Sequence, residues 1–387
     1  MNIMQISFTP FINSAGGIEK VFCNLANYFS EENDVINVFC EGKQGQPVYF
    51  LDNRVKLIDL LDKELKYTFS MKIKHETIRL LKKAGLSNHT LPKMNYKFSI
   101  VKEKLIKIID THSPDVIICY QSYIIVLLDT IGFPMDKVIV MFHSFPRIQD
   151  LNAEEQALLK KVRYIQVLTK GAKDYLSKAG YERIEVIGNA LDKSNAEVAK
   201  LIPEHREKII VCIARLDKKQ KRQHLLIEAF AKLANKYQDW NLYIYGGNET
   251  PKGYSKYLQQ IINSNGLNNR VYLKGISKDV QSDISKCSIF VMPSAYEGFC
   301  ITLVEAMQLG IPCIGYESCP AVNELIIDGV NGFLVSDGVD PMSKAMSCMI
   351  SDEELRKRIG KNSIKSIVQY EKDNVYIKWK KTVKLIG

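Results

Sequence analysis

The sequence lacks long hydrophobic runs and paired cysteines. No apolar stretch approaches the roughly 18 to 20 residues that a membrane-spanning helix needs. The nine cysteines are scattered without a C-x-x-C pair, and several lie in apolar runs, as Cys119 does in DVIICY. They are typical of reduced, buried thiols, so we expect a cytoplasmic protein without disulfides or structural zinc. The start, MNIMQISFTPF, has neither a basic leader nor a long apolar segment, and we expect a first strand there rather than a signal peptide.

Three motifs that would indicate particular chemistries are also missing. The chain contains no G-x-G-x-x-G, which argues against a nicotinamide-dependent oxidoreductase. It contains no D-x-D, so a carboxylate pair holding a catalytic metal is not indicated and we expect metal-independent chemistry. No zinc-finger or RNA-binding aromatic pattern accompanies its basic residues, and nucleic acid is therefore not an expected partner.

Length and patterning indicate a two-domain α/β protein. The chain has 387 residues, 46% of them hydrophobic and 25% charged, which is long for a single core. Short apolar runs alternate with helical patterns, which predicts parallel βαβ units in two Rossmann-like domains facing across a cleft. In the first half, strands are expected at Ile3–Phe8, Val35–Phe39, Val116–Tyr120, Val138–Phe142, Tyr164–Leu168 and Ile184–Ile187. In the second half they are expected at Ile209–Ala214, Asn241–Tyr245, Val271–Lys274, Ser288–Pro293 and Pro312–Gly315.

A polar stretch marks the expected domain boundary. Residues 192–208 are rich in charged and small side chains, and we interpret them as an interdomain link. The predicted domains are 1–190 and 191–373. The last segment, 374–387, is expected to be a basic helix that packs back on the first domain.

The net charge of +10 is concentrated in one segment, 63–107. Apolar residues such as Phe69, Ile73 and Leu81 recur there at helical spacing, which predicts a basic amphipathic stretch. A solvated helix face and a segment lying on an anionic membrane surface both fit this pattern. The basic residues of the segment are Lys63, Lys66, Lys72, Lys74, Arg79, Lys82, Lys83, Lys93, Lys97, Lys102, Lys104 and Lys107, and its acids are Glu64, Glu76 and Glu103.

The segment SAYEGFCITLVEAMQLG, residues 294–310, suits an anionic ligand. A strand is expected to end at Ser294 and a helix to begin near Cys300, and a helix N-terminus with its free N–H groups favours a phosphate. Gly298 permits close approach of the backbone. Glu297 and Glu305 are placed to bond hydroxyl groups at two points along an extended nucleotide sugar. A strand–loop–helix with two solvated glutamates would show the same spacing.

A second cluster, ARLDKKQKR at 214–222, follows the first strand of the second half. Arg215 and Lys221 lie where both cations can converge on one diphosphate, at the strand end where leaving-group charge develops. A basic surface turn is the alternative interpretation.

Two weaker signals occur in the first half. In NSAGGIEK, Gly16 and Gly17 free the loop after the first strand for close contact with a ligand, although a simple turn explains them equally well. His143 follows a buried-type strand and is expected to face the cleft; a lone histidine is more often a structural hydrogen-bonding group.

Taken in order, these motifs resemble those of the family 4 glycosyltransferases, retaining enzymes of the GT-B fold, over nearly the whole chain. The resemblance is carried by GGIEK, ARLDKKQK, YEGFCITLVEAMQLGIPCI and ELIIDGVNGFLV. It implies that Arg215 and Lys221 hold the diphosphate of a nucleotide-sugar donor, that Glu305 bonds the ribose and that Glu297 bonds the transferred sugar.

The resemblance assigns the remaining residues as well. Backbone N–H groups near Phe299, Cys300 and Ile301, beside Gly298, would complete the phosphate site. Gly16 and Gly17 would bring their loop against donor and acceptor. His143 would lie near the reacting sugar.

The expected protein is thus a retaining glycosyltransferase. It would move a hexose or N-acetylhexosamine from a nucleotide-diphosphate sugar, expected to be a UDP-sugar, to a glycan or lipid-linked acceptor in bacterial surface polysaccharide or glycoconjugate synthesis. The donor is a co-substrate, and no other cofactor is expected. We place the protein in the cytoplasm, with peripheral contact to the inner face of the plasma membrane through 63–107. A nucleotide-sugar epimerase of the same fold and a non-catalytic partner subunit remain as alternatives.

Overall fold

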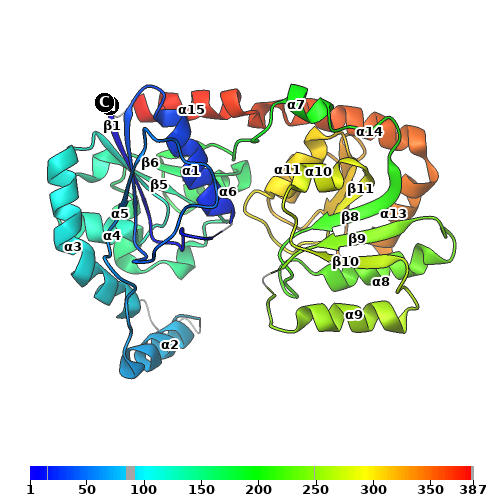
Figure 1. The fold of residues 1–387 in the computed structure, drawn as a ribbon, viewed down its shortest axis with the longest axis horizontal. Helices are drawn as coiled ribbons and strands as arrows, with labels where there is room; N and C mark the ends of the chain where they lie inside the picture. Colours follow the sequence, from blue (N-terminus) through cyan, green and yellow to red (C-terminus); the bar gives the residue numbers. More distant parts are fainter. Residues whose placement is uncertain (15, 84–91, 248, 385–387) are drawn as a thin grey trace. The chain divides into compact units, whose positions relative to one another are not determined.

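The protein consists of two compact α/β units (Figure 1). The computed structural model describes residues 1–14, 16–83, 92–247 and 249–384. Unit 1 comprises residues 1–187 together with the end of the chain from Tyr376, and unit 2 comprises residues 188–375. Among the described residues, no helix is long and apolar enough to cross a membrane.

Unit 1 is built on a seven-stranded sheet in the order β3-β2-β1-β4-β5-β6-β7. All its neighbouring strands are parallel. The strands are β1 (Asn2–Ser7), β2 (Asp34–Phe39), β3 (Lys56–Asp59), β4 (Val116–Cys119), β5 (Val138–Met141), β6 (Tyr164–Val167) and β7 (Ile184–Val186). The helices are α1 (Gly17–Phe29), α2 (Phe69–Lys83), α3 (Pro92–His112), α4 (Ile124–Thr130), α5 (Ala153–Leu159) and α6 (Lys170–Lys178).

Unit 2 repeats the plan with a six-stranded parallel sheet in the order β10-β9-β8-β11-β12-β13. Its strands are β8 (Glu207–Ile213), β9 (Asn241–Tyr245), β10 (Val271–Gly275), β11 (Cys287–Met292), β12 (Cys313–Tyr316) and β13 (Gly332–Val335). Its helices are α7 (Asn195–Ala199), α8 (Gln223–Ala234), α9 (Tyr254–Ser264), α10 (Val280–Ser285), α11 (Ile301–Gln308), α12 (Val322–Leu325), α13 (Val339–Ser351) and α14 (Glu353–Ser366), and α15 (Lys372–Lys384) runs on into unit 1.

Both sheets follow the Rossmann strand order, 3-2-1-4-5-6 when each is numbered from its own first strand, and unit 1 adds a seventh strand, β7, at the end. The strand order reverses between β1 and β4 in unit 1, and between β8 and β11 in unit 2. Ligands of open parallel sheets bind at such switch points, outside the carboxyl ends of the strands. The topology therefore predicts ligand binding at the loops after these four strands.

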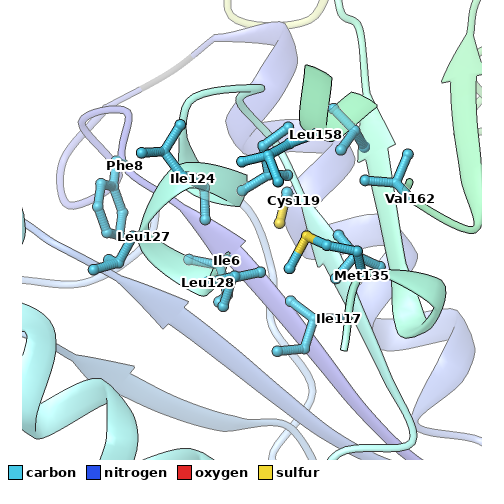
Figure 2. Close-up of a cluster of buried hydrophobic side chains, with 14 of the residues drawn as sticks. Ile6, Phe8, Ile117, Cys119, Ile124, Leu127, Leu128, Met135, Leu158 and Val162 are labelled. Atoms are coloured by element: carbon cyan, nitrogen blue, oxygen red, sulfur yellow. The ribbon is translucent and has the colours of Figure 1, made fainter. Parts of the chain in front are cut away.

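A continuous apolar core holds the sheet of unit 1 to its helices. Figure 2 shows Ile6 of β1 and Ile117 and Cys119 of β4 meeting Leu128 of α4 and Met135. The strand side chains are completely buried. This packing is the reason that the strands are near-continuous apolar runs, as expected for a sheet covered on both faces.

The structure adds two strands that sequence analysis did not predict. β3 and β13 have four residues each and lie at an edge of their sheets. Their side chains are mostly half-buried, so these strands lack the continuous apolar run of a central strand such as β4.

The predicted interdomain link at 192–208 is wrong. That stretch contains α7, begins β8 at Glu207 and belongs to unit 2. Ser194 and Glu197 form a capping box at the start of α7, which accounts for its polar composition. The division between the units falls after Ile187, whereas sequence analysis divides the chain after 190.

The end of α15 packs on α1 of unit 1. Tyr376 stacks on Tyr28 with ring centroids 4.1 Å apart, and Trp379 meets Phe29 edge-on. Lys380 forms a salt bridge to Glu32 at 2.5 Å. The predicted helix 374–387 extends beyond the described residues at 385–387.

Candidate nucleotide-sugar site

Two loops meet at the switch point of unit 2. The turn 214–222 follows β8, and the loop 293–300 follows the neighbouring β11. The Ala295 N–H donates to the Gln220 carbonyl at 2.7 Å, and the Gln220 side-chain amide donates to the Tyr296 carbonyl at 3.2 Å. These bonds fix the two loops to each other, so residues from both can act on one ligand.

Lys221 and Glu297 form the buried ion pair of this site. Lys221 Nζ donates to Glu297 Oε1 at 2.6 Å and to Oε2 at 2.8 Å, and the two side chains are 15% and 6% exposed. Burial lowers the pKa of Lys221, but the charge and hydrogen bonds of Glu297 together with other nearby groups outweigh it, and the pKa lies above its ordinary value. Lys221 is therefore cationic at physiological pH.

Asp217 shapes the turn that presents the cations. Its Oδ1 accepts hydrogen bonds from the N–H groups of Lys219 and Gln220 at 2.9 and 2.8 Å. Its Oδ2 accepts from Arg215 Nη2 at 3.1 Å, and the same nitrogen donates to Gln220 Oε1 at 3.0 Å. The Arg215 side chain is 48% exposed, so its guanidinium is held in place yet accessible to an anion.

Arg222, which sequence analysis did not single out, connects three segments. Its Nε and Nη2 donate to the carbonyls of Pro293 and Ser294 at 3.0 and 2.9 Å, and its Nη1 pairs with Asp337 at 2.7 Å. The guanidinium lies 4.7 Å from the centroid of the Tyr316 ring. Arg222 adopts φ 49°, the left-handed region, which aims the side chain at these carbonyls.

Helix α11 begins at the end of the second loop, at Ile301. In its first turn the Leu303 N–H already donates to the Cys300 carbonyl at 3.1 Å, so the N–H groups of Ile301 and Thr302 are the ones that can bind a phosphate. Cys300 precedes the helix at φ 64°, a conformation that favours glycine. Burial raises the pKa of the Cys300 thiol, so it is protonated and acts as a small apolar group. Thr302 Oγ1 donates to the Ile213 carbonyl at 3.1 Å, which ties α11 to β8.

The other predicted residues of the EGFC segment have distinct positions. Glu305 is buried in the second turn of α11, and Gly298 lies in the loop between Glu297 and Phe299. Phe299 is also buried and meets Tyr370 edge-on, with centroids 4.9 Å apart. A Cβ added at Gly188 would come within 2.7 Å of both rings. The Phe299 side chain is thus a packing group, and only its backbone remains for a ligand.

In unit 1, Gly16 and Gly17 lie where the loop after β1 enters α1. A Cβ added at Gly16 would come within 2.2 Å of Glu19 Oε2, so glycine lets the Glu19 carboxylate fold over the start of the helix. Burial raises the pKa of Glu19, which also accepts a hydrogen bond from Thr9. Sugar hydroxyls can bond to this carboxylate, whereas an ionised phosphate would be repelled by it.

His143 follows β5 and stacks on Tyr120 at the end of β4, with ring centroids 5.1 Å apart and an interplanar angle of 22°. The Tyr120 hydroxyl donates to Gln5 Oε1 at 2.6 Å, and Gln5 Nε2 donates to Asn37 at 3.0 Å. His143 Nε2 is buried, and within the described part of the chain it has no hydrogen-bond partner. Burial lowers the pKa of His143 to about 4, so the ring is neutral near pH 7.

Comparisons with known proteins agree with this arrangement. Residues 193–366 match the family described as glycosyl transferases group 1. A lipopolysaccharide 1,6-galactosyltransferase of Salmonella typhimurium is 26% identical over 362 residues, covering 90% of each chain. The chain is thus similar to glycosyltransferases over nearly its whole length.

Two further comparisons define the extent of the likeness to known proteins. An exopolysaccharide phosphotransferase of Streptomyces coelicolor is 24% identical over 97% of this chain, which spans only 40% of that relative's length. The crystal structure of Anabaena HepE in complex with UDP and glucose has a TM-score of 0.73, with 17% identity and 99% of both chains covered. This last likeness shows that the GT-B fold is shared.

The predicted donor residues gather in one place. Arg215, Lys221 and Glu297 lie in the two bonded loops, with the backbone of 298–301 alongside and Glu305 on the helix that follows. All lie within the segment that matches the family. Gly16, Gly17 and His143 lie in unit 1, at the carboxyl ends of β1 and β5.

Proposed function

We propose that this protein is a retaining, family 4 glycosyltransferase that uses a nucleotide-diphosphate sugar, most simply a UDP-sugar, as donor. A hexose or N-acetylhexosamine would pass to a glycan or lipid-linked acceptor in bacterial surface polysaccharide or glycoconjugate synthesis. The Lys221–Glu297 pair carries this proposal, because it joins a phosphate-binding cation and a sugar-binding carboxylate in a single hydrogen-bonded unit.

The donor would lie across the carboxyl ends of β8 and β11. Arg215 and Lys221 would bind the diphosphate, and the N–H groups at the start of α11 would bind its remaining oxygens. Glu297 would accept hydrogen bonds from the transferred sugar and Glu305 from the ribose. The adjacency of Lys221 and Glu297 suits a donor in which the sugar is bonded directly to the diphosphate.

In the transfer, the bond between the anomeric carbon and the diphosphate oxygen breaks, and its electron pair leaves with the nucleotide diphosphate. The acceptor oxygen bonds to the anomeric carbon on the same face, and its proton passes to a phosphate oxygen of the leaving group. Cations positioned at the diphosphate stabilise the charge that develops there, each contributing roughly 2.7 to 4 kcal/mol. Protein cations would thus do the work of a metal ion, and we propose that neither metal nor other cofactor is required.

Unit 1 would supply the acceptor side. The Glu19 carboxylate beside Gly16 suits a hydroxyl-bearing acceptor, and neutral His143 can donate or accept one hydrogen bond without adding charge. The protein would work in the cytoplasm, at the inner face of the plasma membrane.

Names of related proteins support this assignment. HepE was crystallised with UDP and glucose, and the Salmonella relative is a galactosyltransferase of lipopolysaccharide. A poly(ribitol-phosphate) α-N-acetylglucosaminyltransferase of Staphylococcus aureus is 26% identical over 57% of the chain. The UDP bound by HepE supports a UDP-sugar donor, and the lipopolysaccharide and poly(ribitol-phosphate) enzymes support a glycan acceptor.

The proposal is tested by incubating the protein with a panel of UDP-, GDP- and ADP-sugars and acceptor glycans in EDTA, followed by mass spectrometry of the products. We expect transfer to an acceptor. The NMR coupling of the product should show that the α configuration of the donor is retained. Donor turnover without any acceptor would point to an epimerase, and full dependence on added metal would contradict metal-independent transfer. Inversion of the anomeric configuration would refute the retaining assignment.

A further inference from the structure

Helix α2 of unit 1 exposes an apolar stripe that unit 1 does not cover. Phe69 is 79% exposed, Ile73 53% and Leu80 60%, which places them among the most exposed large hydrophobic side chains described. Their spacing of four and then seven residues puts them on one line along the helix. Figure 1 shows α2 at the periphery of unit 1, away from the sheet.

The opposite face of α2 packs against the rest of unit 1. Met71, His75 and Ile78 recur at helical spacing and are half-buried, and α2 packs on α3. His75 lies near Lys93 of α3, whose charge contributes with burial to a lowered His75 pKa. The Phe69–Ile73–Leu80 stripe is therefore not the core-facing side of the helix. Its exposure calls for a partner other than unit 1.

The surroundings of the stripe carry a net positive charge. Lys72 and Lys74 are exposed on α2, Lys66 is exposed just before it, and the exposed Glu76 is paired with Arg79. A cavity of about 680 Å³ between the loop after β3 and α3 has a mixed charged lining, with Lys63, Lys66, Lys104 and Lys107 beside Asp62, Glu64 and Glu103. Apolar side chains flanked by lysines fit an anionic surface with an apolar interior.

We propose that α2 docks the protein on an anionic phospholipid bilayer. Phe69, Ile73 and Leu80 enter the boundary between headgroups and acyl chains, while Lys66, Lys72 and Lys74 meet lipid phosphates. Charge decides between a membrane and a second copy of the chain, because two such basic surfaces repel each other. Apolar insertion and electrostatic attraction together provide the two contributions that stable peripheral binding needs.

This contact identifies the helix that would hold the protein at the membrane. It rests on the proposed function only for its biological purpose. Vesicle binding needs neither donor nor acceptor. A failure of docking would therefore leave the transferase assignment intact, and a failure of transfer would leave the docking result intact.

The experiment is co-sedimentation of the full chain with vesicles of equal parts phosphatidylglycerol and phosphatidylcholine, and with vesicles of phosphatidylcholine alone. The test variant is Phe69→Gln with Ile73→Gln, because glutamine keeps helix propensity on an exposed face. The matched control is Phe50→Gln, since Phe50 is 76% exposed in the same unit but lies outside α2. Sedimentation equilibrium without vesicles reports the oligomeric state of each variant.

We expect the wild-type protein and the control to bind the phosphatidylglycerol vesicles equally and to leave the phosphatidylcholine vesicles unbound. The α2 variant should bind the phosphatidylglycerol vesicles about tenfold or more weakly than the wild-type protein. Raised salt should weaken the remaining binding. The proposal is overturned if the wild-type protein binds neither vesicle, or if Phe50→Gln lowers binding as much as the α2 variant. It is also overturned if the α2 variant dissociates a dimer and leaves vesicle binding unchanged, because a second copy would then cover the stripe.

Discussion

Lys221 donates hydrogen bonds to both carboxylate oxygens of Glu297, at 2.6 and 2.8 Å, and so joins the loop after β8 to the loop after β11. Neither side chain is more than 15% exposed. A buried ion pair of this kind is costly to break on one side, because the remaining charge has no partner. The pair therefore has a structural role in addition to the chemical role proposed for it.

The pairing makes Lys221→Ala a test with two separable outcomes. The single change should weaken donor binding and also lower the free energy of unfolding of unit 2 by about 3 kcal/mol, because Glu297 stays buried without its cation. Adding Glu297→Gln should restore most of that stability and leave donor binding lost. Urea unfolding and calorimetric titration with the nucleotide measure the two effects. Equal stability of the single and double variants would show that the ion pair does not bear on folding.

Cys300 permits a test of backbone strain at the start of α11. Both Cys300→Gly and Cys300→Ala remove the buried thiol, but only glycine is relaxed at φ 64°. The glycine variant should be the more stable of the two by about 1 kcal/mol. Thermal unfolding of the two proteins measures this difference. A more stable alanine variant would contradict the left-handed conformation at this position.

Even the replacement of Arg222 by lysine should lower the stability of the protein. Arg222→Lys keeps the charge and the left-handed backbone, but a single ammonium cannot bond the Pro293 and Ser294 carbonyls and Asp337 in the same fork. We expect a loss of about 2 kcal/mol in stability and weaker nucleotide binding. Lys219→Arg, an exchange of the opposite sense in the same turn, is the control and should change neither. Wild-type behaviour of Arg222→Lys would leave the guanidinium without a role in joining the loops.

His143 predicts a definite pH dependence of stability. Its pKa is about 4 in the folded protein and about 6.5 in an unfolded chain. Between these values the unfolded chain binds more protons, so stability present above pH 6.5 is lost as the pH falls towards 4. His143→Gln should lessen that loss, by at most about 3 kcal/mol. Urea midpoints of both proteins from pH 7 to pH 4 provide the comparison, and parallel curves would place His143 in solvent.

The sequence predicts the βα alternation well because buried parallel strands are continuous apolar runs. Val116–Tyr120 and Val138–Phe142 correspond to β4 and β5 within a residue. The edge strands β3 and β13 escape detection because they are mostly half-buried and lack the fully apolar run of the equally short β4 and β5. The polar composition of 192–208 was misleading, since α7 uses Ser194 and Glu197 as caps rather than as part of a solvated link.

Site residues were predictable as a set of motifs but not as contacts. The spacing of Arg215, Lys221, Glu297 and Glu305 identifies the loops that form the site. Nothing in that spacing shows that Lys221 bonds Glu297, because their proximity depends on the pairing of β8 with β11 across 76 positions of sequence. Arg222 looked like one more basic residue in KKQKR, and its role follows only from three carbonyl and carboxylate partners brought in by the fold.

The most direct test of the central claim is a thermal-shift titration of the wild-type protein and of Lys221→Met with Glu297→Gln, using UDP, GDP and ADP in EDTA. A ligand present at about 100 times its Kd stabilises the folded protein by roughly 2.7 kcal/mol, which is readily measured. We predict a selective shift by one nucleotide, UDP first among them, in the wild-type protein and its loss in the double variant. No shift with any nucleotide, or an equal shift in the double variant, would contradict a donor site at Lys221 and Glu297.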